Sequence, residues 1–403
     1  MVLVLRPPSS SLPPLVPGIE RRTVLAAREL GVAAVRIPAL LRCRDGRIVV
    51  FAEARREGAG DTGPIEVIAR TSADGTRWAD PVVVATAPGR TMGNPVPIEA
   101  GDGAIVLLTT SNDAAVHEAE ILAGSVPAAS GRRVHLTRLS PDLARIGTCQ
   151  DLTDQVKDPA WDWYATGPGH GVALADGRLV AAANHSRRDP DGRPHYAAHG
   201  LLSEDDGHSW SIAWTARSTA EAASPNESAL ALAPADGAPE LLVTCRSEDP
   251  AGPRTRSIGR IDPALLRAGT ALEATGRFAA LAGFAGPRIQ AGLAAAPPSL
   301  PGTGPRGGSG EAAAPEALLS APVRAAARRD LVLHAIAGSA CRPLALLHPG
   351  PAGYSDLAVA DGEILVLVET GQERTHERID LLRADLADIA AAVRPAPSKE
   401  QTP

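Results

Sequence analysis

The stretch Ser203-Glu-Asp205-Asp-Gly207-His-Ser-Trp210 decides the fold class of this chain. It fits the pattern Ser-x-Asp-x-Gly-x-x-Trp at every fixed position, and that pattern is typical of a tight hairpin turn. The Ser and Asp side chains bind backbone N–H groups, Gly adopts a positive φ, and Trp packs beneath the turn. A second stretch, Thr71–Trp78, repeats the Gly-x-x-Trp spacing with its Asp one position late. The repetition indicates a structure built from repeated β-sheet units.

Short apolar runs elsewhere in the chain support this interpretation. Each run has the length of a strand and is rich in Val, Ile and Leu. Four of them closely follow an Asp-Gly pair, which is a strong tight-turn signal. Helical periodicity is confined to 317–327 and 381–393. The predicted strands are Arg47–Glu53, Ala104–Thr109, Arg178–Ala183, Glu240–Cys245, Asp330–Ile336 and Glu363–Glu369. Their spacing suits a propeller with somewhat long blades, although a β-sandwich would also be compatible with the strand pattern.

Composition limits the classes of function. The chain has 403 residues, 44% of them hydrophobic and only 3% aromatic, so its core must come from aliphatic side chains. A net charge of −6 argues against a nucleic-acid partner. No apolar run approaches the length of about 18 residues that a membrane span needs. The first residues lack the features of a signal peptide, which favours a cytoplasmic location over secretion.

We predict a single domain over residues 19–393, with a flexible N-terminal segment at 1–18 and a flexible tail at 394–403. A low-complexity stretch at about 292–314 is predicted to be a surface insertion within this domain. The four cysteines have neither metal-ligand nor redox spacing and are expected to be buried free thiols. They are Cys43, Cys149, Cys245 and Cys341.

Several further motifs occur in a fixed order. They are Arg36-Ile37-Pro38, Phe51-Ala-Glu53-Ala-Arg55, Asp61 in a Gly-rich loop, Asn226-Glu227-Ser228 followed by Arg246, Arg328-Arg329-Asp330-Leu331, and Gly353-Tyr354-Ser355-Asp356-Leu357. Together they resemble the bacterial exo-α-sialidases of the Asp-box, or BNR-repeat, superfamily, similar to glycoside hydrolase family 33. The resemblance extends from about residue 30 to residue 385, and the turn stretches are similar to that superfamily's Asp boxes. It implies a six-bladed β-propeller and a retaining hydrolase that releases terminal α-linked sialic acid without metal or cofactor.

The resemblance also implies roles for particular residues. Arg36, Arg246 and Arg328 would clamp the substrate carboxylate, with Arg329 as a rival for the third place. Tyr354 would be the nucleophile and Glu227 the residue that activates it, while Asp61 would be the acid/base. Glu369 would support Arg36, and Arg55 would lie near the sugar's O4.

The chemistry of sialic acid explains this combination of side chains. Three guanidiniums can bind the carboxylate on the anomeric carbon through paired, charge-assisted hydrogen bonds. A carboxylate nucleophile would be repelled by that anion, whereas a neutral phenol is not, and sialidases are known exceptions to carboxylate nucleophiles in glycosidases.

Other features leave alternatives open. The segments Met92–Pro95 and Trp161–Gly171 are candidates for contacts with the sugar, and the second could hold its N-acetyl or glycerol group. His170 and His185 lack metal-ligand spacing and are expected to be structural or to lie at the substrate's edge. The expected partner is a sialylated glycan, and the sequence does not indicate an oligomeric state. The alternatives are a KDN-preferring hydrolase, a trans-sialidase-like enzyme and a non-catalytic propeller that binds sialylated glycans.

Overall fold

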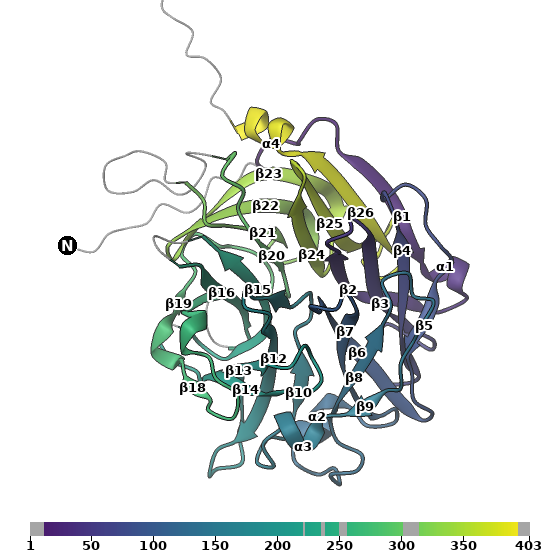
Figure 1. The fold of residues 1–403 in the computed structure, drawn as a ribbon, viewed down its shortest axis with the longest axis vertical. Coiled ribbons are helices and arrows are strands. Elements are labelled where there is room, and N and C mark those ends of the chain that lie inside the picture. The colour runs from purple at the N-terminus through teal and green to yellow at the C-terminus, as the bar shows by residue number, and fades with distance from the viewer. Residues whose placement is uncertain (1–11, 221, 235–237, 250–255, 301–313, 394–403) are drawn as a thin grey trace, which may run out of the picture.

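The structure is a computed structural model, and it describes residues 12–220, 222–234, 238–249, 256–300 and 314–393. Its strands form sheets that fan out around a common axis, as in a β-propeller (Figure 1). The prediction of an all-β propeller fold is therefore confirmed, and the β-sandwich alternative is wrong.

Four of the sheets each form one blade-like unit. The first joins β1 (Glu20–Ala26), β26 (Arg378–Asp385), β25 (Glu363–Thr370) and β24 (Ser355–Ala360). The second contains β10 (Tyr164–Thr166), β11 (Val172–Ala173), β12 (Leu179–Arg188), β13 (Pro194–Ser203), β14 (Ser211–Ala216) and β18 (Leu272–Glu273). The third contains β15 (Pro225–Ala233), β16 (Glu240–Ser247), β17 (Arg256–Ile261) and β19 (Phe278–Ala280). The fourth contains β20 (Gly292–Ala295), β21 (Ala317–Pro322), β22 (Arg329–Ala337) and β23 (Ala340–Pro351).

The fifth sheet is larger and corrects the prediction of six blades. It is one continuous eight-stranded sheet of β2 (Ala34–Arg42), β3 (Ile48–Arg55), β4 (Ile65–Ser72), β5 (Val82–Ala85), β6 (Arg90–Glu99), β7 (Ile105–Asp113), β8 (Arg133–Leu139) and β9 (Gln150–Asp151). Its two parts join where Ile65 of β4 pairs in parallel with Thr91 of β6. The prediction of six separate blades is wrong because this pairing merges strands that their apolar patterns assign to separate hairpins.

The chain closes on itself through its first and last strands. β1 pairs antiparallel with β26, and six residue pairs connect the two strands from Glu20↔Arg383 to Ala26↔Arg378. The two strands lie side by side in Figure 1 although they are far apart in the sequence. N-terminal and C-terminal segments therefore complete one sheet together.

The turn that decides the fold has the predicted chemistry. The backbone N–H of Gly207 donates to Ser203 Oγ at 2.8 Å, and the N–H of Ser209 donates to Asp205 Oδ1 at 2.9 Å. Gly207 has φ +85°, and the buried indole of Trp210 donates to its carbonyl at 3.2 Å. These contacts fix the connection between β13 and β14.

The second turn uses the same interactions with one residue fewer. Gly75 N–H donates to Ser72 Oγ at 2.9 Å, and Trp78 Nε1 donates to the Gly75 carbonyl at 3.1 Å. The shorter spacing between Ser and Gly explains why its Asp appears out of place in the sequence pattern. This turn connects β4 to β5.

Helices are few and short among the described residues. They are α1 (Ala27–Leu30), α2 (Glu118–Leu122), α3 (Thr153–Val156), α4 (Leu386–Val393) and the 3-10 turns η1 (Pro263–Leu265) and η2 (Thr275–Arg277). The predicted helical pattern at 317–327 is wrong because that stretch begins with β21, while the pattern at 381–393 is helical only from Leu386. No described helix is long and apolar enough to cross a bilayer.

The predicted segment boundaries can be compared with the structure only in part. Residues 1–11, 301–313 and 394–403 lie outside the described residues. The stretch predicted as an insertion begins with β20, so its first residues belong to a sheet. Within the predicted N-terminal segment, Leu15 forms a parallel bridge with Leu346, and Val16 is buried at 2% exposure.

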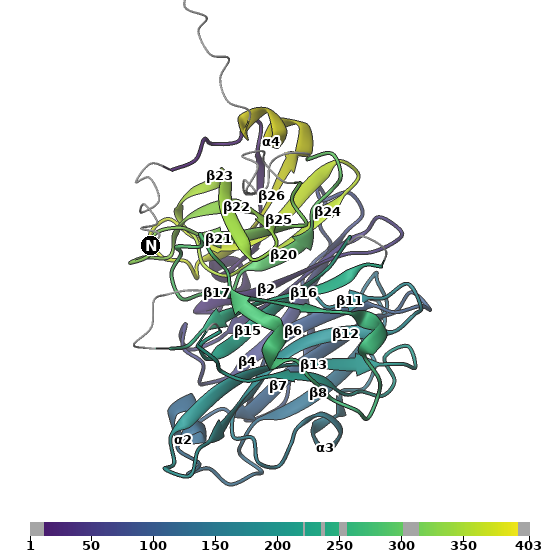
Figure 2. The same ribbon diagram turned by 90° about the vertical axis from the view of Figure 1, so that its left-hand side faces the viewer.

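Figure 2 shows the propeller turned by 90°, with α4 at one end of the molecule and α2 and α3 at the other. Most of the buried hydrophobic side chains are Ala, Val, Leu and Ile. Trp214 is fully buried beside Phe278 in the cluster between the second and third blade-like sheets. Three of the cysteines are buried free thiols as predicted, but the prediction fails for Cys149, which is exposed.

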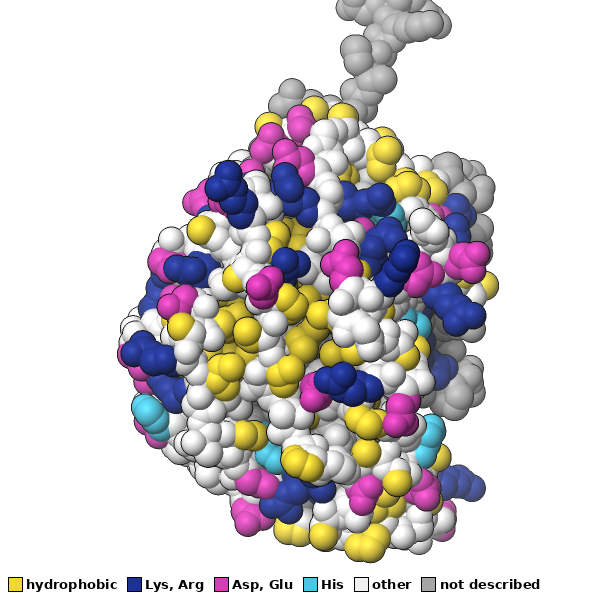
Figure 3. All heavy atoms as spheres, turned by 90° about the vertical axis from the view of Figure 1, so that its right-hand side faces the viewer, with side chains coloured by type: hydrophobic (Ala, Val, Ile, Leu, Met, Phe, Trp, Pro, Cys, Tyr) yellow, Lys and Arg dark blue, Asp and Glu magenta, His cyan; other side chains and the backbone are white. Residues whose placement is uncertain are grey.

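Figure 3 shows the side of the molecule that carries β1, β5 and α1, and apolar side chains gather near its centre within a rim of charged side chains. β5 is a short edge strand in which Val83 is 40% exposed while Val84 is buried. This edge strand contributes to the exposed apolar surface.

Candidate active site

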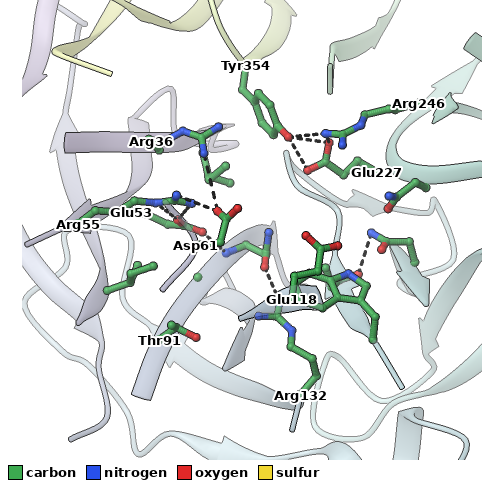
Figure 4. A pocket seen from close by; sticks show the side chains of 18 of the residues that line it. Arg36, Glu53, Arg55, Asp61, Thr91, Glu118, Arg132, Glu227, Arg246 and Tyr354 are labelled. Carbon is green, nitrogen blue, oxygen red and sulfur yellow. Dashed lines mark hydrogen bonds and ion pairs between the residues drawn. The ribbon is translucent and has the colours of Figure 1, made fainter. Parts of the chain in front are cut away.

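A polar cavity of about 170 Å³ lies at the start of the strands nearest the propeller axis, among them β2, β15 and β24. Its lining comes from distant parts of the chain and contains charged side chains of both signs (Figure 4). The charged members are Arg36, Glu53, Arg55, Asp61, Glu118, Glu227, Arg132, Arg246 and Arg328. The other end of the same strands borders a wider and largely apolar groove, lined among others by Leu40, Val172, Ala231, Ala294 and Val359. The polar cavity is the candidate active site because a phenol, several carboxylates and several guanidiniums line it together.

Tyr354, Glu227 and Arg246 form one hydrogen-bonded group. The Tyr354 hydroxyl donates to the Glu227 carboxylate, with its oxygens at 2.7 and 2.8 Å. Arg246 Nη1 donates to the same phenolic oxygen at 2.7 Å and to Glu227 Oε2 at 2.5 Å. Glu227 comes from the start of β15, Arg246 from the end of the adjacent β16, and Tyr354 from just before β24. The phenol therefore has both a proton acceptor and a cation at its oxygen.

This environment keeps the phenol protonated at neutral pH. Burial raises the pKa of Tyr354 above its ordinary value, and the charge of Glu227 raises it further, although Arg246, Arg36 and Arg328 lower it. Glu227 is the carboxylate placed to accept this proton if the phenol loses it.

The guanidinium groups of Arg36 and Arg328 both lie over the ring of Tyr354. Their guanidinium carbons are 5.2 and 5.4 Å from the centroid of the Tyr354 ring. The rival Arg329 is exposed at the start of β22 and does not line the cavity. Arg36, Arg246 and Arg328 thus surround one side of the pocket together.

Glu369 connects Arg36 to the backbone of Tyr354. It is fully buried and accepts the backbone N–H groups of Ile37 at 2.8 Å and Tyr354 at 3.2 Å, and it lies 3.4 Å from Arg36 Nε. A Cβ at Gly353 would come within 2.2 Å of its Oε2. Gly353 is therefore needed so that Glu369 can approach the backbone of Tyr354.

Asp61 lies across the pocket and is held by two arginines. Its Oδ1 is 2.8 Å from Arg55 Nη1 and 3.8 Å from Arg36 Nη1. Burial raises the pKa of Asp61, but Arg55 and Arg36 outweigh it, so the pKa is lower than the ordinary value. Asp61 is consequently a carboxylate at neutral pH.

Hydrogen bonds to Glu53 on the same strand and to two backbone carbonyls of the following loop hold the Arg55 side chain in place. Its Nε donates to Glu53 Oε2 at 2.8 Å, and its Nη1 donates to the carbonyls of Ala59 and Gly60 at 2.6 and 2.7 Å. In the sequence Glu53 stands out only as part of the Phe51–Arg55 motif, and the structure places it in the cavity wall. Arg55 thereby positions the loop that carries Asp61.

No sequence motif indicates a role for Glu118 or Arg132, although both line the cavity. Tyr196 donates to Glu118, and burial raises the pKa of that carboxyl above its ordinary value. Neither residue stands in a recognisable motif, because β7, α2 and β8 bring them to the pocket only in the folded chain. Asn94 and Trp163, from the two segments predicted to contact the sugar, also line it.

The two histidines considered in the sequence lie away from this cavity. His170 Nδ1 is 2.9 Å from buried Asp356 and borders the apolar groove, whereas His185 is buried and stacks on Trp161. Among the described residues, no group of three or more His, Cys, Asp or Glu side chains is arranged to hold a metal ion.

The fold and the pocket define the class of this protein, which is a propeller with an arginine-lined site where its inner strands begin. A family model described as a BNR repeat-like domain matches residues 46–259, just over half of the chain. The chain therefore belongs to the BNR repeat-like family.

Two curated relatives are sialidases by name. The chain is 34% identical over 171 residues to an exo-alpha-sialidase of Aspergillus fumigatus, covering 38% of this chain and 42% of the relative. It is 32% identical over 218 residues to human sialidase-4, covering 48% of this chain and 43% of the relative. The matches thus span less than half the length of these relatives.

Solved structures show the same fold. The Hadza microbial sialidase Hz136 has a TM-score of 0.71 and 22% identity, with 91% of this chain and 68% of that chain covered. A Trypanosoma rangeli sialidase mutant displaying trans-sialidase activity has a TM-score of 0.70 and 16% identity, covering 94% and 60%.

Proposed function

We propose that this protein is an exo-α-sialidase that hydrolyses terminal α-linked sialic acid with retention of configuration. The observation that carries the proposal is the phenol of Tyr354, which is hydrogen-bonded to both Glu227 and Arg246 inside a pocket that also contains Arg36 and Arg328. The names of the Aspergillus fumigatus and human relatives support the same activity. A solved Trypanosoma rangeli sialidase, described as a complex with sialic acid, has this fold.

The substrate carboxylate is the first group that the site would bind. Arg36, Arg246 and Arg328 present guanidiniums to the same side of the pocket, and this geometry suits a planar anion. The bound carboxylate would place the anomeric carbon beside the Tyr354 oxygen. Because the substrate is itself an anion there, a neutral nucleophile avoids charge repulsion.

In the first chemical step the Tyr354 oxygen attacks the anomeric carbon, and the bond to the leaving oxygen breaks. Glu227 accepts the phenolic proton, and Asp61 donates a proton to the departing alcohol. Asp61 must first gain that proton. Binding of the substrate carboxylate to Arg36 would weaken one of the two cationic contacts that keep its pKa low.

In the second step water replaces tyrosine. Asp61, now a carboxylate, removes a proton from water, and the water oxygen attacks the anomeric carbon. The bond to Tyr354 breaks, and the phenolate regains its proton from Glu227. Two successive inversions at the same carbon give net retention.

Release of a fluorescent alcohol from an aryl α-sialoside tests the proposed activity. We expect the wild-type protein to release it and the variant Arg328→Ala to lose most of kcat/KM. The adjacent variant Arg329→Ala is the matched control, because Arg329 is exposed outside the cavity. Equal losses in both variants would contradict the assignment of Arg328 to the clamp.

Proton NMR of the first product distinguishes the stereochemical outcomes. Early appearance of the α-anomer supports retention, whereas early β-anomer contradicts a tyrosine intermediate. A wild-type protein that binds sialosides but releases no alcohol would instead be a non-catalytic glycan-binding propeller.

A further inference from the structure

Two arginines face each other on neighbouring strands of the third blade-like sheet. Arg246, near the end of β16, and Arg256, at the start of β17, are directly opposed residues of the antiparallel pairing. Directly opposed side chains lie on the same face of a sheet, and like charges in this position destabilise it. Arg246 is partly buried and Arg256 is only 2% exposed, so water screens their repulsion poorly. The pair therefore needs compensating negative charge.

Arg246 receives such compensation from two carboxylates. Its Nη1 donates to Glu227 Oε2 at 2.5 Å, and its Nη2 forms an ion pair with Glu248. Glu248 is shared with a third cation, because Arg288 Nη1 lies 3.3 Å from its other oxygen. The two carboxylates therefore balance only two positive charges, those of Arg246 and Arg288.

Arg256 receives no such compensation. In the described part of the chain no carboxylate lies within ion-pair distance of it. Its Nη2 donates to the Ile289 carbonyl, its Nη1 lies 3.4 Å from Thr244 Oγ1, and its guanidinium carbon is 5.4 Å from the centroid of the Phe284 ring. Burial lowers the pKa of Arg256 to about 10, which leaves it charged at neutral pH. Because buried charges in proteins are normally paired, one positive charge here still requires a partner.

The same two arginines also carry unsatisfied donors. The Nε atoms of Arg246 and Arg256 are both buried, and neither has a hydrogen-bond partner among the described residues. A guanidinium Nε–H can only donate, so each of these groups needs an acceptor. A buried donor without an acceptor destabilises the folded state. One small acceptor with a negative charge would satisfy both donors and balance the charge of Arg256.

A small cavity borders both arginines and limits the size of such an acceptor. Its volume is about 10 Å³, which is room for one particle of the size of a water molecule. Its wall contains Arg246, Arg256, Arg288 and Ser247, together with apolar residues of the loop before β20, and no Asp or Glu of the described chain lines it. Sulfate, phosphate and organic carboxylates are too large for this space. A monatomic ion fits it.

We propose that this small cavity is a binding site for a halide ion, which is chloride under physiological conditions. A chloride ion accepts hydrogen bonds from several N–H groups at once, and those from guanidiniums are strengthened by charge. It also supplies the one negative charge that the arginines lack. A water molecule has a similar size and accepts hydrogen bonds, but it is neutral and would leave the buried charge of Arg256 unbalanced.

The halide site is separate from the candidate active site but shares one side chain with it. Arg246 lines both cavities. Its Nη1 donates to the Tyr354 oxygen at 2.7 Å on the side of the candidate active site (Figure 4). An ion bound to Nε would hold the guanidinium by an edge that Tyr354 and Glu227 do not use. The halide is thus a structural ligand that keeps Arg246 in place.

Bromide provides a direct test with the wild-type protein, because it replaces chloride and scatters X-rays anomalously. We expect crystals soaked in sodium bromide to show an anomalous difference peak within hydrogen-bond distance of Nε of both Arg246 and Arg256. A peak found only in the polar cavity beside Arg36 and Arg328 would overturn the proposal. So would the lack of any bromide between Arg246 and Arg256, since water would then be the occupant.

Thermal melting tests the site in solution. A ligand that binds only the folded state raises Tm, so wild-type Tm should be about 2–5 °C higher in sodium chloride than in sodium gluconate of equal ionic strength. Gluconate is too large for the cavity. We expect Arg256→Met to lose this difference, because neither the charge nor the Nε–H remains.

The matched control is Arg260→Met, which changes an arginine on the same strand. Arg260 already pairs with Glu240 and Glu316, so its loss should leave the chloride-dependent difference in Tm unchanged. An equal difference in wild type and Arg256→Met would contradict the site, whatever the absolute Tm of each variant. If Arg256→Met does not fold, the bromide experiment on the wild-type protein decides the question alone.

Discussion

Tyr354 is the residue on which the proposed chemistry depends most directly. Its hydroxyl is held by Glu227 and Arg246, while its ring faces Arg36 and Arg328. We expect Tyr354→Phe to keep its affinity for an unsaturated sialic-acid analogue within about threefold, because the guanidiniums remain. Turnover of an aryl sialoside should fall by about a thousandfold or more, because no nucleophilic oxygen remains. Calorimetric titration and a fluorescence assay measure the two quantities, and turnover close to wild type would refute the assignment.

Asp61 gives a prediction that depends on the leaving group. If it protonates the departing oxygen, Asp61→Asn should lower kcat/KM strongly for natural alkyl glycosides. It should matter much less for an aryl substrate whose phenol leaves readily without a proton. The comparison is made with sialyllactose and an aryl sialoside at the same pH. A similar loss on both substrates would contradict the acid role.

The residues of the pocket differ in how far the sequence could predict them. Arg36, Glu227 and Tyr354 stand in short motifs, so a resemblance could propose them, and the structure brings them into one cavity. Glu118 and Arg132 have no such motif, and their environments arise only from contacts between distant segments. Arg132 likewise donates a hydrogen bond to the Asn94 side chain, which is 38 residues away in the sequence.

At the scale of elements, the loop before β24 packs closely against the buried end of β25, where Gly353 contacts Glu369. The close approach of Gly353 to Glu369 leaves no room for a side chain. We expect Gly353→Ala to displace Glu369 and thereby the acceptor of the Ile37 and Tyr354 N–H groups. The kcat/KM should fall more than about tenfold, and unfolding should become easier by about 1–3 kcal/mol.

The control for this variant is Gly276→Ala, since a Cβ there would meet nothing within 4 Å and the backbone is not left-handed. Activity assays and chemical denaturation of both variants make the comparison. Wild-type activity in Gly353→Ala would show that Glu369 can move without affecting the site.

The elements themselves were predictable where their residues were distinctive. Runs such as Glu363–Glu369 identify strands because they are short, rich in Val, Ile and Leu, and follow a tight-turn signal. The stretch at 317–327 misled because its alanines favour a helix by intrinsic propensity, whereas hydrogen bonds to β20 and β22 make its first part a strand. The parallel pairing of β4 with β6 could not be predicted, because a single pair of residues, Ile65 and Thr91, joins the two strands and no local sequence pattern marks it.

At the scale of the whole molecule, a buried histidine pair connects stability to pH. His185 Nδ1 and His199 Nδ1 are 3.0 Å apart on β12 and β13, next to Trp161. Burial lowers the pKa of His185 to about 3 and holds that of His199 well below its ordinary value. In the unfolded chain both histidines should have a pKa of about 6.5.

The sign of the effect follows from these directions. Above about pH 6.5 both histidines are neutral in either state, so they cost no stability. As the pH falls below that value, His185 and His199 bind protons in the unfolded chain but remain neutral in the folded protein. The free energy of unfolding should then fall by up to about 1.4 kcal/mol per pH unit for each histidine.

Thermal melting between pH 7 and pH 5 measures this dependence. We expect His199→Gln to melt with a shallower pH slope than wild type. His195→Gln is the control, since His195 is half-exposed and pairs with Asp189. Identical slopes in all three proteins would exclude the buried pair as the cause.

The pairing of β1 with β26 constrains how the protein can be made. While the ribosome is still adding the last third of the chain, the exposed edge of β1 has no native neighbour to bind. The sheet that contains β1 and β26 can form only after translation has passed Asp385. Until then the propeller is not closed, and the backbone N–H and C=O groups along the edge of β1 have no strand to pair with. Chaperone dependence during synthesis should accordingly be greatest just before β26 emerges.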